Sequence, residues 1–249
     1  MAIVQTKKIP AYILKITSKI TVPKWPPKSD FSNYVLKFMK KNATEKQALK
    51  LMKTNKYFIR ENCPFIYFGD YVKLTQGFVH QTFSTPAVAP YEKNFRIEEL
   101  PNNLGIGGTL IIQHENLVSQ FISKCVTCDL KDLFCNNGMW KILKISYDDF
   151  KFLTSSGRLK RLRLGNTIVV SNNGEIIPYE TLFDHTPALR YFCLEYNKDL
   201  KMSQKFYEKI CASNLEEFIV YELPENFERE AFLANMAKKP NLRVYLSFK

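Results

Sequence analysis

The fold of this chain is decided by five stretches of its sequence, LKDLFC (130–135), LKRLRL (159–164), LRYFCL (189–194), LEEFIV (215–220) and LRVYLS (242–247). Each has apolar residues at its first, fourth and sixth positions, except that the last stretch ends in Ser247. They begin 29, 30, 26 and 27 positions apart, at Leu130, Leu159, Leu189, Leu215 and Leu242. Such a recurrence predicts a structure built from one repeated unit.

The intervals between these stretches have the features of helices. SYDDFKFLTSS (146–156) opens with Ser146 as a candidate N-cap, with Asp149 three residues later. SQKFYEKICAS (203–213) places Phe206 and Ile210 one turn apart, and EREAFLANMAKK (228–239) stops before a proline. One strand and one helix at this interval is typical of leucine-rich repeats. An ordinary α/β domain with leucine-rich strands is the alternative.

We therefore expect an irregular leucine-rich-repeat-like solenoid of alternating strands and helices over residues 109–249. GTLIIQ (108–113) and ENLVSQFISK (115–124) have the pattern of an atypical first repeat, which gives five or six units. Residues 63–108 contain short alternating stretches broken by proline and glycine, and are expected to form strands and loops that connect this domain to the N-terminal part.

The positive charge of the chain is concentrated near its N-terminus. Residues 1–62 hold 14 Lys and Arg against 3 Asp and Glu, so 11 of the 12 net positive charges lie there. Residues 1–30 are basic and contain prolines, and residues 31–62 have the apolar spacing of three short helices. A bundle of this size is too small to be stable alone, so it needs a partner or the rest of the chain. The charge favours an acidic partner.

No catalytic or metal site can be assembled from the sequence. Cys125, Cys128 and Cys135 have the spacing of a zinc site, but no nearby histidine or cysteine supplies a fourth ligand, so buried thiols are expected. The three histidines are too far apart to predict a common site. We expect no cofactor and no enzymatic activity. Because no long apolar run or signal peptide is present, we expect no membrane association and a cytoplasmic or nuclear location.

Two stretches resemble a known family. SNYVLKFMKKNATEKQALKLMKTNKYFIRENCPFIYF (32–68) resembles the divergent F-box of the large nematode F-box families, and residues 145–195 resemble the repeat domain attached to those F-boxes. F-boxes usually begin with a Leu-Pro pair, whereas this chain has Pro26-Pro27. The resemblance implies a substrate-recognition subunit of an SCF-type ubiquitin ligase, in which residues 31–62 form an α-helical F-box bundle that binds a Skp-type adaptor and, through it, the cullin and RING subunits.

Carried over by position, the adaptor-binding residues implied by the resemblance are Tyr34, Val35, Phe38, Met39, Leu49, Leu51, Met52 and Phe58. Each of them could instead fill the intramolecular core, since a short amphipathic helix does not show which neighbour covers it. Nucleic-acid binding by the basic N-terminal segment, through interleaved lysine and aromatic residues, is the competing hypothesis and the less favoured one. A repeat scaffold without coupling to a ligase is a third.

A protein substrate is expected on the face of the repeat strands that is turned away from the helices. The residues that alternate there with the core positions are Arg161, Arg163, Tyr191, Cys193, Glu195, Glu217, Ile219, Tyr221, Val244 and Leu246. This set mixes basic, acidic, aromatic and aliphatic side chains, which favours one specific protein over a polyanion. The alternative is a solvated sheet face that binds nothing.

Overall fold

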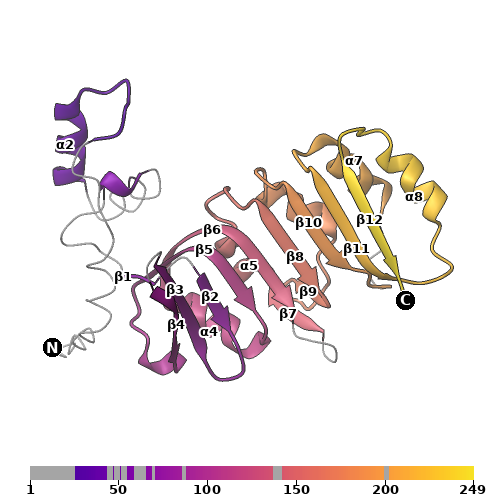
Figure 1. Cartoon of the computed structure of the whole chain (residues 1–249), viewed down its shortest axis with the longest axis horizontal. Coiled ribbons are helices and arrows are strands. Elements are labelled where there is room, and N and C mark those ends of the chain that lie inside the picture. The colour runs from indigo at the N-terminus through magenta and orange to yellow at the C-terminus, as the bar shows by residue number, and fades with distance from the viewer. Residues whose placement is uncertain are drawn as a thin grey trace.

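The computed structural model describes residues 26–43, 47, 51, 55–58, 66–68, 71–85, 88–136, 142–198 and 202–249. These residues form a mixed α/β fold with one large, mostly parallel sheet (Figure 1), which confirms the predicted α/β class. Among them, no helix has both the length and the apolar character needed to cross a membrane.

The large sheet has ten strands. Nine lie in the order β12-β11-β10-β8-β6-β5-β2-β3-β4, and β1 also pairs with β5. The pairs β2–β3 and β3–β4 are antiparallel, and all the others are parallel. The strands are β1 (Ile66–Tyr67), β2 (Tyr71–Leu74), β3 (Val79–Thr85), β4 (Val88–Phe95), β5 (Leu104–Ile112), β6 (Cys125–Asn136), β8 (Arg161–Gly165), β10 (Tyr191–Glu195), β11 (Glu217–Leu223) and β12 (Arg243–Phe248).

From β5 onward, the strands of the large sheet are arranged in the order of the sequence, so each new strand lies beside the previous one. Helical segments make up most of the connections between them. The helices described are α2 (Asn33–Asn42), α4 (Val118–Ser123), α5 (Tyr147–Leu153), α6 (Tyr179–Leu182), α7 (Gln204–Ala212) and α8 (Arg229–Met236). Short 3-10 helices occur at η1 (Lys56–Phe58), η2 (Ile97–Glu99), η3 (Glu115–Leu117) and η4 (Phe183–His185). Two further strands, β7 (Leu143–Ser146) and β9 (Thr167–Val170), form a separate parallel pair.

Serine hydroxyls cap α2 and α5, and one of these serines, Ser146, is the N-cap that the sequence predicts. The Ser32 hydroxyl accepts a hydrogen bond from the Val35 amide at the start of α2. Ser146 accepts one from the Asp149 amide, at 3.0 Å between Oγ and N, and so caps α5. Each of these hydroxyls satisfies one of the amides that a helix leaves without an intrahelical partner.

The helices after β5 cover one face of the sheet, and the core lies between them and the strands. Phe206 of α7 packs against Phe218 of β11 with ring centroids 5.8 Å apart, and Phe192 of β10 stacks on Phe218 at 5.6 Å. These three side chains are fully buried, as are Leu133 of β6 and Leu162 of β8. The opposite face has no helix over it in Figure 1 and is called the open face below.

The registers show that four of the five stretches are equivalent. Asp132 is paired with Arg161, Arg161 with Tyr191, and Tyr191 with Glu217, so the third positions of these stretches are aligned. The fifth stretch is displaced by one residue, because Glu217 is paired with Arg243. The true interval is therefore 26 residues, and the equivalent stretch begins one residue before Leu242. Strand side chains alternate between faces, so this slip exchanges the two faces of β12.

The prediction that Val244 and Leu246 lie on the open face is therefore wrong. Val244 is paired with Phe218 and Leu246 with Val220, and both pack against the core beneath the helices. Arg243 and Tyr245 occupy the open face in their place. The sequence pattern places this stretch one residue too late, because Leu242 fits the first position of the pattern although it precedes the strand.

The region before residue 109 contributes to the same sheet. The expected boundary between residues 108 and 109 falls inside β5, and β2 pairs with β5 from Tyr71–Thr109 to Leu74–Ile112. In the expected helical module, α2 corresponds to the first helix and η1 to the third apolar cluster. Of the second helix, only Gln47 and Leu51 are among the described residues, and both are helical.

Candidate protein-binding surfaces

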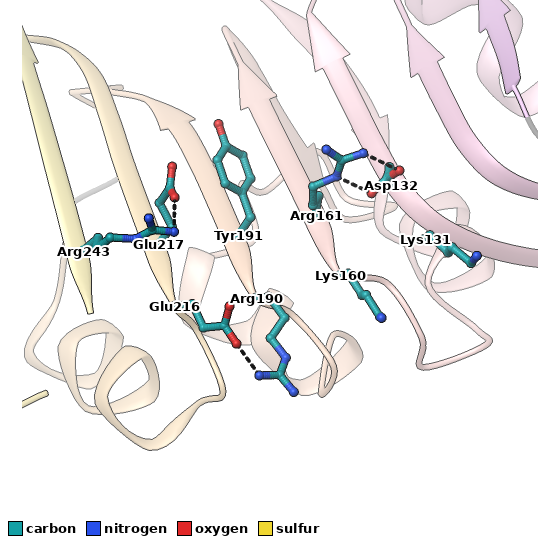
Figure 2. Close-up of a pocket in the computed structure, with 9 residues that line it drawn as sticks. All are labelled: Lys131, Asp132, Lys160, Arg161, Arg190, Tyr191, Glu216, Glu217 and Arg243. Carbon is teal, nitrogen blue, oxygen red and sulfur yellow. Dashed lines mark hydrogen bonds and ion pairs between the residues drawn. The ribbon is translucent and has the colours of Figure 1, made fainter. Parts of the chain in front are cut away.

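The open face carries a row of polar side chains at equivalent positions of successive strands. From β5 to β12 this first row consists of Thr109, Asp132, Arg161, Tyr191, Glu217 and Arg243. Two ion pairs tie neighbouring strands together within it (Figure 2). Arg161 Nε and Nη2 donate to the two carboxylate oxygens of Asp132, at 2.6 and 2.8 Å. Arg243 pairs with Glu217 at 2.8 Å.

The Asp132 carboxylate is held ionised by these contacts. Its hydrogen bonds with Arg161, and a further one donated by the Thr109 hydroxyl at 3.0 Å, hold the pKa of Asp132 below its usual value despite partial burial. The same ion pair raises the pKa of Arg161. Tyr191 lies between the two ion pairs, and partial burial raises the pKa of its phenol to about 12, with a further contribution from Cys193. Tyr191 therefore stays neutral at physiological pH.

A second set of charges lies one residue before the first row, within β6 and immediately before β8, β10 and β11. Lys131, Lys160, Arg190 and Glu216 are linked in that order by backbone hydrogen bonds of 2.7–2.8 Å, each from the amide of the later residue to the carbonyl of the earlier one. Arg190 pairs with Glu216, and both side chains are more than half exposed. We call these four residues the edge row.

The first row and the edge row enclose a shallow hollow of about 450 Å³, open to solvent. Figure 2 shows its lining, with the ring of Tyr191 rising between the ion pairs and Lys160 and Arg190 extending from the strand edge. Its nine lining residues comprise five cations and three carboxylates together with Tyr191. The hollow is therefore lined by charged side chains, with positive charge along one side, and it is open to solvent, unlike the enclosed sites that are typical of small molecules.

Farther along the same strands, open-face side chains pack against each other. The guanidinium carbon of Arg163 on β8 lies 5.8 Å from the ring centroid of Tyr221 on β11, although β10 runs between the two strands. Cys193 of β10 is almost completely buried, and this burial raises the pKa of its thiol despite a side-chain hydrogen bond with Tyr191 and the nearby Arg163, which lower it. The predicted contact residue Cys193 is therefore on the expected face but is covered by its neighbours.

The structure brings most of the predicted target-binding residues together on the open face. Arg161 and Arg163 are exposed, and a half-buried group surrounds them: Tyr191, Glu195, Glu217, Ile219 and Tyr221. Sequence reasoning missed Asp132, which occupies the same position of its stretch as Arg161 does, and the repeat pattern could have found it. It also missed the edge row, whose members are the second residues of the four equivalent stretches.

A different surface is exposed at α2. Tyr34 and Phe38, one turn apart, are 78% and 57% exposed, and Val35 beside them is also exposed, whereas Leu36 is buried. Phe31, just before the helix, is 60% exposed. Four large apolar side chains so close together are unusual on a surface that contacts only water. We call Phe31, Tyr34, Val35 and Phe38 the α2 face.

The other residues that the resemblance assigned to adaptor binding lie differently. Met39 and Leu51 are half-buried, and Phe58 is buried beside Tyr57, so Phe58 fills the intramolecular core and is not available to a partner. The ammonium group of Lys40 lies 4.6 Å from the Tyr57 ring centroid, which packs α2 against η1. Leu49 and Met52 lie outside the described residues.

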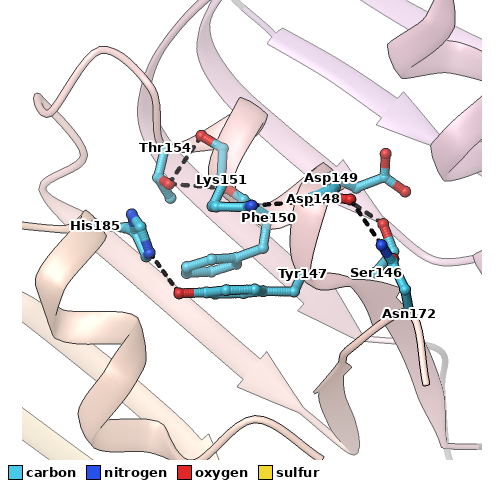
Figure 3. A network of polar contacts seen from close by, with 9 residues as sticks. All are labelled: Ser146, Tyr147, Asp148, Asp149, Phe150, Lys151, Thr154, Asn172 and His185. Carbon is cyan, nitrogen blue, oxygen red and sulfur yellow. Dashed lines mark hydrogen bonds and ion pairs between the residues drawn. The ribbon is translucent and has the colours of Figure 1, made fainter. Parts of the chain in front are cut away.

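The remaining polar network lies on the helical side and joins successive units (Figure 3). Tyr147 at the start of α5 and His185 of η4 share a 2.7 Å hydrogen bond between the hydroxyl and Nε2. Lys151 pairs with Asp148 across one turn of α5, at 2.6 Å. Within the described part of the chain, no three His, Cys, Asp or Glu residues are grouped so that they could hold a metal ion. Cys125, Cys128 and Cys135 are buried, as predicted.

No family model, curated protein or solved structure matches this chain.

Proposed function

We propose that the chain is the substrate-recognition subunit of an SCF-type cullin-RING ubiquitin ligase. In this proposal the α2 face binds a Skp-type adaptor, and the open face of the sheet holds the protein to be ubiquitinated. The observation that carries it is the exposure of Tyr34 and Phe38 on one side of a short helix that is packed on its other side through Leu36.

The physical argument starts from the cost of leaving the α2 face in water. Fully burying one aromatic or branched side chain contributes about 1.5–3 kcal/mol, so a partner helix that covers Tyr34 and Phe38 gains a large part of its affinity there. Lys40 and Lys41 lie in the last turn of α2, and the net charge of residues 1–62 is strongly positive. An acidic helical partner, which Skp adaptors tend to be, complements both properties.

The target-binding half of the proposal rests on the repeated geometry. We infer that residues from β5 onward form an irregular leucine-rich-repeat solenoid, because equivalent strands follow each other in register every 26 to 30 residues with their helices on one face. Such arrays recognise partners through the sheet face that the helices leave uncovered. The mixed charge and aromatic character of the open face suits a protein surface.

The mechanism that follows is recruitment without chemistry by this chain. The α2 face anchors the subunit to the adaptor, and the open face holds the target near a ubiquitin-loaded enzyme carried by the RING subunit. Tethering raises the effective concentration of the target lysines around that enzyme, which accelerates transfer by proximity alone. In this mechanism no side chain of the chain acts as an acid, a base or a nucleophile.

The test is co-purification of the full chain with a Skp-type adaptor. Tyr34→Asp combined with Phe38→Asp should weaken binding by roughly a hundredfold or more, since two aromatic side chains of about 1.5–3 kcal/mol each leave the interface. The matched control is Leu233→Asp combined with Tyr245→Asp, two exposed apolar side chains of α8 and β12. This control should bind the adaptor as the wild type does.

Failure of the wild-type chain to bind the adaptor would refute the proposal. In that case, binding of a single-stranded oligonucleotide with a steep salt dependence would support the competing nucleic-acid hypothesis. A chain that binds neither would be a repeat scaffold without coupling to a ligase.

A further inference from the structure

The edge row contains two adjacent lysines that have no ion-pair partner in the part of the chain that the structure describes. The amide of Lys160 is hydrogen-bonded to the carbonyl of Lys131 at 2.7 Å, and that of Arg190 to the carbonyl of Lys160 at 2.8 Å, so three cationic residues follow one another across β6, β8 and β10. Like charges at directly neighbouring positions of a sheet are destabilising. Among the described residues, Arg190 has a carboxylate partner, whereas Lys131 and Lys160 take part in no ion pair.

The carboxylates close to these lysines are already engaged. Asp132 is held by both Arg161 nitrogens and by the Thr109 hydroxyl. Asp129, in the same strand as Lys131, is paired with Arg158. Lys131 and Lys160 are both exposed on the rim of the hollow. Within the described part of the chain, the edge row therefore keeps an excess of positive charge.

We propose that this rim binds an acidic segment of the target protein, with carboxylates or phosphates of an extended peptide against Lys131, Lys160 and Arg190. The inference deepens the proposed function and rests on it, because it names the chemistry of the target that the open face holds. Arg190 can exchange its exposed partner Glu216 for a peptide anion at little cost, since surface ion pairs contribute only about 0–1 kcal/mol.

The spacing of the edge row defines the peptide further. Neighbouring strands lie about 4.8 Å apart, so Lys131 and Arg190, two strands apart, are separated by roughly 10 Å. A peptide in the polyproline II conformation advances about 3.1 Å per residue and has three residues per turn, so acidic residues at positions i and i+3 point to the same side and reach both ends of the cationic row. Tyr191 directly follows Arg190 at the start of β10, and its neutral ring offers a surface for an apolar side chain next to the acid that meets Arg190.

The inference can be tested without knowing the target. The full chain is immobilised and exposed to a degenerate decapeptide library, and in parallel to a second library with one fixed phosphoserine, and the residue frequencies of the bound peptides are measured. One exposed ion pair changes affinity by about 1.4- to 5-fold. Peptides with Asp or Glu at both i and i+3 should therefore be enriched by roughly 2- to 25-fold.

The decisive variant is Lys131→Gln combined with Lys160→Gln, which should abolish this enrichment. The matched control is Lys205→Gln with Lys238→Gln, two exposed lysines of the helical side, and it should keep the enrichment. Enrichment confined to the phosphoserine library would support the same anion chemistry with phosphate as its source. Adaptor binding is measured in the same preparations, so that failure of the ligase proposal is recognised separately.

Three results would overturn the inference. The first is a bound fraction without acidic enrichment in either library. The second is an enrichment that survives in the Lys131 and Lys160 variant. The third is a single-stranded oligonucleotide that binds more tightly than the selected peptides and displaces them, which would assign the rim to nucleic acid. If any of these occurs while the adaptor still binds, the ligase proposal stands and only the identity of the target surface changes.

Discussion

Phe218 and Ile219 are neighbours on β11 whose side chains point to opposite faces of the sheet, and replacing each by alanine should have very different effects. Phe218 is fully buried and contacts the rings of Phe192, Phe206 and Phe232, at centroid distances of 5.6, 5.8 and 6.1 Å. Phe218→Ala should lower the free energy of unfolding by about 4 kcal/mol, because a buried phenylalanine replaced by alanine costs about 3–5 kcal/mol.

Ile219→Ala serves as the matched variant. Its side chain is half-buried on the open face, and it loses three methyl or methylene groups. At about 0.8 kcal/mol for each fully buried group, half-burial gives a cost of about 1 kcal/mol. The difference between the two variants, about 3 kcal/mol, comes from the face that each side chain occupies together with the larger size of phenylalanine.

The assay is urea unfolding of both variants and the wild type, followed by far-UV circular dichroism. For a slope of roughly 3 kcal/mol per molar urea, Phe218→Ala should lower the midpoint by about 1.3 M and Ile219→Ala by about 0.3 M. Equal shifts for the two variants would refute the assigned faces of β11, and with them the position of the open face. A shift below about 0.5 M for Phe218→Ala would refute its place in the core.

Two further predictions concern ionisable groups. Arg161 holds the folded-state pKa of Asp132 below the unfolded value of about 3.9, so the Asp132 carboxylate stabilises the fold above that pH and loses its effect as the pH falls through the lower folded value. Asp132→Asn should therefore be less stable than the wild type at pH 7, and the difference in the free energy of unfolding should disappear below about pH 3 in urea titrations. A difference that stays constant with pH would contradict the assignment. Burial raises the pKa of Cys125 to about 12, which disfavours its reactive thiolate. Iodoacetamide at pH 8 should therefore label half-exposed Cys211 before Cys125, and Cys125 should stay unlabelled until denaturant is added, as peptide mass spectrometry can show. Early labelling of Cys125 would contradict its burial.

The repeated part of the fold could be predicted because its pattern is redundant. Four stretches share the same apolar positions, and the registers from Asp132–Arg161 to Tyr191–Glu217 align them without a shift. A strand pattern with only one copy to support it is easily misplaced by one residue. LRVYLS begins with a leucine that lies outside β12, so Val244 and Leu246 were assigned to the wrong face.

The binding surfaces could be predicted only in part. The open-face residues Arg161, Arg163 and Glu217 follow from strand alternation, but the edge row lies outside that rule, because Lys131 lies at a register shift of β6 and the other members precede their strands. Burial of Cys193 depends on neighbours from two other strands. Amphipathic spacing alone could not tell exposed Phe38 from buried Phe58, because both patterns fit a short helix.

The order of the strands also bears on how the chain folds as it is synthesised. From β6 to β12, each strand pairs with one that was translated 26 to 30 residues earlier, and no pair within this part waits for a distant segment. At roughly 5–20 residues per second, about 1–6 seconds separate the emergence of successive strands, whereas short helices and strand pairs form in microseconds. Each new unit can therefore dock on a completed predecessor, so this part of the nascent chain exposes only one growing sheet edge at a time, and β12 is the last strand to be added to it.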